Sequence, residues 1–126
     1  MTAYWGSSAI IAAWINPEIR MRLHRERGVT RTHSLVEVFS AFTGGDLTIR
    51  QGADEAARTI ANLAQDLDQT EVVAALRLAH VKGLRGGRVH DYLHAVAAEK
   101  IQAEKLLTVD RGDFNGITVL EIEQLG

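Results

Sequence analysis

Three aspartates lie around a predicted strand in the C-terminal part of the sequence. Apolar residues recur at helical spacing around Asp91, which we place in the first turn of a helix. Residues 105–108 predict a short buried strand, and Asp110 and Asp113 follow its carboxyl end. In an open parallel sheet, that edge is where ligands bind. Carboxylates gathered at such an edge suit a hard divalent cation, so these residues indicate metal chemistry.

The composition narrows the classes of function open to this chain. It has 126 residues, enough for one domain with a substantial core, and no cysteine, which excludes disulfides and thiolate metal sites. Its formal net charge of −2 gives no general attraction to nucleic acid, so a contact with RNA must come from a local patch. The apolar N-terminal run is short and interrupted and lacks a basic leader, so we expect a cytoplasmic protein with no membrane role.

The apolar pattern predicts short strands separated by helices. Such an order favours parallel βαβ units with helices on both faces of the sheet. We therefore expect a three-layer α/β/α sandwich with a short, mainly parallel sheet, formed by residues 1–126 as a single domain. The predicted strands are 2–5, 105–108 and 118–122, with brief extended pieces at 29–32 and 47–50. The predicted helices are 9–14, 18–27, 34–42, 53–67, 71–82 and the one that carries Asp91.

Local signals predict where the first helices begin and end. Ser7 and Ser8 are candidate caps of the first helix, because a serine side chain accepts hydrogen bonds from the free N–H groups there. Pro17 opens the second helix, and Gly28 is predicted to end it as the C′ residue.

Four segments carry a family resemblance in a fixed order: WGSSAIIAAW, THSLVEVFSAFTGG, GGRVHDYLHAVAAEK and LLTVDRGDF. Together they resemble the PIN domain and, in this short form, the VapC-type toxins of bacterial toxin–antitoxin systems. The resemblance spans nearly the whole chain. It implies a hydrolase, a nuclease that cleaves RNA phosphodiesters with bound Mg²⁺ or Mn²⁺. It also implies a homodimer that binds a cognate antitoxin protein, whose tail reaches the acidic pocket.

The family carries acids at the end of the first strand, on a mid-chain helix, at a later helix start and at the end of the fourth strand. In this sequence those places are Gly6, Glu37, Asp91 and Asp110, with Asp113 as an additional or substitute acid. The resemblance thus implies Glu37, Asp91 and Asp110 as catalytic residues and metal ligands, helped by Asp113.

Other residues near these acids are candidates for supporting roles. Ser7, Ser8 and Thr108 could orient metal-bound waters, although capping explains the serines equally well. Arg85 and Arg88 flank the acidic helix and are candidate contacts for RNA or the antitoxin.

Gly6 departs from the family pattern, which has Asp before Ser or Thr at this place. Losing that carboxylate should weaken metal binding and leave the attacking water less well oriented. Three explanations compete: a sequence changed to silence a toxic enzyme, a natural PIN-like protein that binds without cutting, and a site that works with the remaining acids. The residues around Gly6 otherwise keep the family pattern, and this favours the first explanation, a sequence changed to silence a toxic enzyme. The alternative to a ribonuclease is a catalytically inactive PIN-like module that binds RNA or protein.

The candidate acids also have purely structural interpretations. Asp91 could serve only the helix dipole, and Asp110 and Asp113 could build a turn around Gly112. Glu37 could be an ordinary solvated residue, but its apolar neighbours mean that its carboxylate needs a partner.

Histidine, arginine and aromatic patterns complete the candidates. His90 and His94 lack a zincin motif, so we interpret them as surface or substrate-facing residues. The arginines between residues 20 and 31 form either a solvated helix face or an RNA-binding strip.

Large apolar side chains on two N-terminal helices predict a dimer interface. They are Trp14, Ile15, Phe39 and Phe42.

Overall fold

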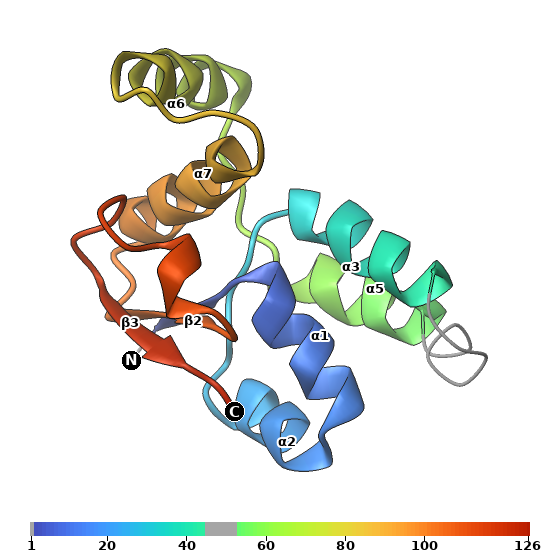
Figure 1. The fold of residues 1–126 in the computed structure, drawn as a ribbon. Coiled ribbons are helices and arrows are strands. Elements are labelled where there is room, and N and C mark those ends of the chain that lie inside the picture. Colours follow the sequence, from blue (N-terminus) through green and yellow to red (C-terminus); the bar gives the residue numbers. More distant parts are fainter. Residues whose placement is uncertain (1, 45–52) are drawn as a thin grey trace.

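The computed structural model describes residues 2–44 and 53–126, and the extended piece predicted at 47–50 lies outside this range. Three strands, β1 (Ala3–Trp5), β2 (Lys105–Thr108) and β3 (Glu121–Gln124), form a parallel sheet in the order β1-β2-β3. A parallel bridge from Tyr4 to Val29 places another segment beside β1 (Figure 1). The predicted strand at 105–108 is confirmed with the same bounds.

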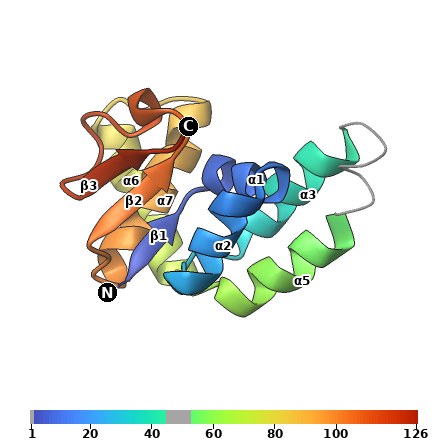
Figure 2. The same cartoon turned by 90° about the horizontal axis from the view of Figure 1, so that it is seen from below.

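Helices cover both faces of the sheet. The helices α1 (Ser7–Ile15), α2 (Pro17–Arg25), α3 (His33–Thr43) and α5 (Ala53–Leu63) lie on one side. The helices α6 (Gln69–Val81) and α7 (Gly87–Lys100) lie on the other, and a short 3-10 helix, η1 (Arg111–Asp113), follows β2. In Figure 2 the three strands lie side by side, with α6 and α7 behind them and α1 and α2 to their right. The expected three-layer α/β/α sandwich is confirmed.

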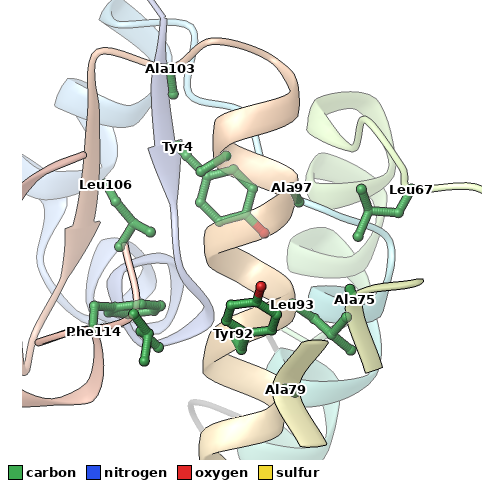
Figure 3. Packing of buried hydrophobic residues seen from close by; sticks show 12 residues of the cluster. Tyr4, Leu67, Ala75, Ala79, Tyr92, Leu93, Ala97, Ala103, Leu106 and Phe114 are labelled. Atoms are coloured by element: carbon green, nitrogen blue, oxygen red, sulfur yellow. The ribbon is translucent and has the colours of Figure 1, made fainter. Parts of the chain in front are cut away.

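Alternation along the strands explains why both faces are covered. Ala3 and Trp5 of β1 pack with α1, α2 and α3, whereas Tyr4 between them packs with α6 and α7. In β2, Leu107 faces the first group and Leu106 the second. Because successive strand residues point to opposite faces, two buried faces require two helical layers. Figure 3 shows the cluster between the sheet and α7, with the Tyr4 hydroxyl pointing toward that helix.

The predicted helix 53–67 and the predicted last strand have other bounds in the structure because further hydrogen bonds engage their backbone. The predicted helix 53–67 ends at Leu63, since Thr30 N donates to Leu63 O and Gln65 N donates to Thr30 O, at 3.2 and 2.8 Å. The last strand is Glu121–Gln124 rather than 118–122, because the Thr118 hydroxyl accepts from Leu120 N and forms a turn there. Residues 29–32 contribute single bridges at Val29 and Thr30 instead of a full strand.

The end of α2 corrects the role predicted for Gly28. Arg27, with φ +50°, is the residue in the left-handed conformation, and the N–H groups of Arg27 and Gly28 bond the carbonyls of His24 and Leu23. This is a Schellman end with arginine at C′. Gly28 is needed for space, because a Cβ there would lie 2.5 Å from Leu23 and 2.6 Å from the Trp5 ring.

No helix in the described part of the chain is both long enough and apolar enough to cross a bilayer.

Candidate functional site

Gly6 connects β1 to α1 and stands at the N-cap of that helix. Its φ and ψ of −67° and 164° suit any residue, so the backbone does not require glycine. A Cβ would meet the backbone oxygen of Leu107 at 3.3 Å and the Phe114 ring at 3.8 Å, so a side chain here requires Leu107 O to move by a few tenths of an ångström. The backbone dihedral angles at this place therefore allow Asp, and the contact with Leu107 O is the one that must relax.

The two serines after Gly6 lie inside α1, so the prediction that they cap it is wrong. Ser8 Oγ lies 3.2 Å from Thr108 Oγ1 and accepts from Val109 N, which ties α1 to the end of β2. Ser7 Oγ lies 3.4 Å from His94 Nε2 and 3.4 Å from Ser34 Oγ. Only Ser7 therefore reaches the neighbourhood of Glu37.

Glu37 is half-buried on α3, and a buried histidine of α7 binds its side chain. His94 Nε2 lies 2.9 Å from Glu37 Oε1, and His94 Nδ1 lies 2.6 Å from the Tyr4 hydroxyl of β1. Burial opposes ionisation of Glu37, but hydrogen bonds from His94 and Ser7 hold its pKa below the usual range. His94 is thus the partner that a carboxylate with apolar neighbours needs.

Asp91 lies in the second turn of α7, not in the first turn as predicted. The helix begins at Gly87, after Gly86 with φ +58°, and its first turn contains no acid. Since the effect of the helix dipole fades within the first turn, a dipole role does not explain Asp91. Burial and the nearby negative charge of Asp113 raise the pKa of Asp91, and Glu37 adds to that effect.

Asp110 and Asp113 differ in their surroundings although both follow β2. Asp110 is exposed and caps η1, where Oδ1 accepts from Gly112 N at 2.9 Å. This contact supports the structural interpretation of Asp110 as a turn residue. Asp113 is half-buried, and burial together with the charge of Asp110 raises its pKa. Asp91 and Asp113 therefore both have a pKa that burial and a neighbouring carboxylate raise, and such groups mark a candidate functional site.

The donor set suits a hard cation in its chemistry but not in its arrangement. Within residues 2–44 and 53–126, no group of three or more histidine, aspartate or glutamate side chains could hold a metal ion. Gly6 offers no carboxylate, Glu37 is bound to His94, and Asp110 is turned into η1. The site of Glu37, Asp91, Asp110 and Asp113 expected for Mg²⁺ or Mn²⁺ is therefore incomplete as it stands.

Arg88 lies beside the acids, and its positive charge offsets part of the rise in the pKa of both Asp91 and Asp113. It is exposed and donates to Asn115 O at 3.1 Å, whereas Arg85 is exposed at the start of the same helix region. The other arginines do not form one strip. Arg20 bonds the last carbonyls of α1, Arg22 pairs with Glu26 and Glu123, and Arg31 is buried.

His94 and Tyr4 are the residues that sequence reasoning missed at this site. His94 is only 3% exposed, so its interpretation as a surface or substrate-facing residue is wrong. His90 is exposed and stacks on His33 with ring centroids 5.4 Å apart. The position of His94 within an otherwise apolar run of α7 was the available signal, because a buried histidine needs partners.

Comparison with known proteins supports the fold. No protein-family model and no curated protein sequence matches this chain. Among solved structures, one match is VapBC2 from Rickettsia felis, a structure bound to a DNA fragment from the VapBC2 promoter. It matches with a TM-score of 0.69 and 16% identity over 100% of both chains. VapBC-5 from Mycobacterium tuberculosis, a member of the VapBC family of toxin–antitoxin systems, matches with a TM-score of 0.59 and 20% identity over 98% of each chain.

These matches define the class of fold. The chain shares the fold of these VapBC structures over nearly its whole length, and that fold is the α/β/α sandwich that the sequence resemblance predicted.

Proposed function

We propose that this chain is the toxin of a VapC-like toxin–antitoxin pair, a PIN-type endoribonuclease whose divalent-metal site is incomplete because residue 6 is glycine. The fold that it shares with VapBC structures supports the class. The proposed cofactor is Mg²⁺ or Mn²⁺, and the proposed partners are an antitoxin protein and an RNA substrate in the cytoplasm.

One observation supports this proposal, namely that Gly6 follows β1 and lies next to segments that carry the candidate carboxylates. The next residue, Ser7, contacts the His94–Glu37 pair, and the Phe114 ring beside Gly6 follows directly after Asp113. The φ and ψ of residue 6 do not require glycine. A carboxylate at residue 6 would therefore join Asp91 and Asp113 at the carboxyl edge of β1 and β2.

The chemistry of RNA hydrolysis explains why activity should be low in this chain. A bound divalent cation supplies activated water and offsets charge at the phosphate. The acids of this site carry negative charge and by themselves repel a phosphate. We therefore expect weak cation binding and little cleavage until residue 6 contributes a carboxylate.

The test compares this chain with its Gly6→Asp variant. We expect Gly6→Asp to bind Mn²⁺ at least about tenfold more tightly in calorimetric titration and to gain Mg²⁺-dependent cleavage of structured RNA, because each carboxylate offsets cation charge. The matched control is Gly6→Asn, which has the same shape without the charge. Equal Mn²⁺ affinity in the Asp and Asn variants would sink the proposal.

A second candidate function is a PIN-like module that binds RNA or protein without catalysis. The contact between His94 and Glu37 favours it, because one of the implied metal ligands already has a protein partner. This candidate predicts that Gly6→Asp still fails to cleave RNA. In both candidates Arg88 lies beside the acids, where it can pair with an RNA phosphate or an antitoxin carboxylate.

A further inference from the structure

The Glu37 carboxylate is held by a row of hydrogen-bonded side chains that starts at Tyr4 in the sheet. Tyr4 of β1 is fully buried, and its hydroxyl lies 2.6 Å from His94 Nδ1. The two rings meet edge to face with centroids 5.8 Å apart. His94 Nε2 then lies 2.9 Å from Glu37 Oε1. The Tyr4–His94–Glu37 chain thus joins β1, α7 and α3.

The direction of the hydrogen bonds follows from the chemistry of the three groups. Glu37 is ionised, so its oxygens only accept, and His94 Nε2 must carry the hydrogen between them. Burial raises the pKa of the Tyr4 phenol far above its usual value, so its hydroxyl keeps a proton that it can donate to Nδ1. Every polar atom of the imidazole is then satisfied.

This arrangement fixes His94 firmly. Turning the imidazole away from Glu37 would leave a buried N–H without an acceptor and break the bond to a fully buried hydroxyl, and both changes are unfavourable. Ser7, with Oγ 3.4 Å from His94 Nε2, closes the chain on the side of α1.

We propose that His94 is a built-in partner of Glu37 that takes the place of a divalent cation. The protein then meets the hydrogen-bonding need of the Glu37 carboxylate with its own side chains. His94 is a positioning residue and contacts no reacting group. A cation that binds Glu37 through Oε1 must displace the N–H donor and leave that donor unpaired inside the protein, and a cation that binds through Oε2 meets a carboxylate whose basicity the hydrogen bond has already lowered. The absence of a three-ligand metal group in the described residues agrees with this competition.

The inference rests on the proposed function in one respect, that Glu37 is a carboxylate a cation would use. Its test measures metal binding and needs no RNA cleavage. We expect His94→Leu, which removes the donor, to bind Mn²⁺ about tenfold more tightly than the unchanged chain, as measured by calorimetry and by Mn²⁺ electron paramagnetic resonance. A variant that binds Mn²⁺ no more tightly than the unchanged chain would overturn the inference.

Three matched variants separate this effect from a general loosening of the protein. His94→Leu combined with Glu37→Gln should return to the original affinity, because the freed carboxylate is gone. His94→Gln keeps an N–H donor and should also keep the original affinity. His90→Leu removes an exposed histidine from the same helix and should change nothing. A gain that survives Glu37→Gln would contradict the role of Glu37.

A measurement on the unchanged chain keeps the inference testable if His94→Leu does not fold. The ¹⁵N resonances of the His94 ring report both of its hydrogen bonds. They should stay in place when Mg²⁺ is added at millimolar concentration. A shift of Nε2 that follows Mg²⁺ occupancy would show that the cation takes Glu37 from His94, which refutes the inference.

The outcomes also distinguish this inference from the proposed function. If Gly6→Asp gains Mn²⁺ affinity and cleavage but His94→Leu gains no affinity, the ribonuclease proposal stands and the inference falls. If His94→Leu gains affinity through Glu37 while neither Gly6→Asp nor Gly6→Asp combined with His94→Leu cleaves RNA, the inference stands and the ribonuclease proposal falls.

Discussion

At the scale of single residues, Gly28 and Arg27 divide two tasks that one glycine often performs. Arg27 adopts the left-handed conformation at the end of α2, at φ +50°. Gly28 lets the chain pass close to Leu23 and the Trp5 ring before it pairs with β1. The first task costs Arg27 some backbone strain, and the second leaves no room for any side chain at residue 28.

Gly28→Ala should destabilise the fold. The added Cβ would lie 2.5 Å from Leu23 Cδ1 and 2.6 Å from Trp5 Cδ1, and overpacking of a buried site costs about 1–3 kcal/mol. Urea unfolding followed by tryptophan fluorescence measures the change. The matched control is Arg27→Gly, which should be neutral or stabilising because it relieves the left-handed strain. An Ala variant as stable as the unchanged chain would show that Trp5 and Leu23 can move aside.

At the scale of elements, a group of ion pairs fastens α2 to β2 and β3 at the edge of the fold. The Arg22 guanidinium binds Glu123 of β3 through two nitrogens and Glu26 of its own helix. Lys105 of β2 adds a contact to Glu123 at 3.0 Å. Hydrogen bonds from Arg22, together with Lys105, lower the pKa of Glu123 to about 2.

This low pKa predicts how stability depends on pH. The folded pKa of Glu123 is about 2 and its ordinary value is 4.5, so the stabilisation is complete above pH 4.5 and is lost as the pH falls toward 2. Glu123→Gln should therefore be less stable at pH 7 and lose less stability between pH 4.5 and pH 2. Glu121→Gln, an exposed change on the same strand, is the control. If Glu123→Gln and the unchanged chain lose the same free energy of unfolding between pH 4.5 and pH 2, the role of this network is contradicted.

At the scale of the whole molecule, the sheet separates two apolar clusters that the helical layers cover. Phe42, expected at an interface, is 1% exposed and belongs to the cluster on the α1 side, so that part of the interface prediction is wrong. Trp14 is partly buried, and Arg20 lies over its ring. Ile15 and Phe39 stay exposed, at 63% and 41%, at the end of α1 and on α3. Exposed large apolar residues often mark an interface.

We predict a two-fold symmetric dimer that uses this N-terminal helical layer. Light scattering at high micromolar concentration should give the mass of a dimer. Phe39→Glu should shift the protein toward monomer, because a charge would be buried without a partner in the interface. Val119→Glu is the control, since Val119 is 92% exposed on the loop before β3. A monomer of the unchanged chain at that concentration would refute the prediction.

The sequence by itself determined the features that repeat locally. The short apolar run in 105–108 and the helical spacing around 34–42 predicted β2 and α3 almost to the residue, because the run is typical of a strand buried on both faces and the spacing of a helix with one buried face. The order of four short segments led to the PIN-like class, and the solved structures confirm that fold. The same order placed Glu37, Asp91, Asp110 and Asp113 as candidates, whose chemical roles stay predictions.

Only the tertiary structure decided which partners these residues have. Nothing near Glu37 in the sequence shows that Tyr4 and His94, from two other elements, complete its hydrogen bonds. The ends of α2 and α5 shifted because Arg27 took the left-handed position and Thr30 captured the backbone of 63–65. Propensity acts between neighbours in the chain, whereas burial and hydrogen bonding act between neighbours in space, and at this site the neighbours in space come from β1, α3 and α7.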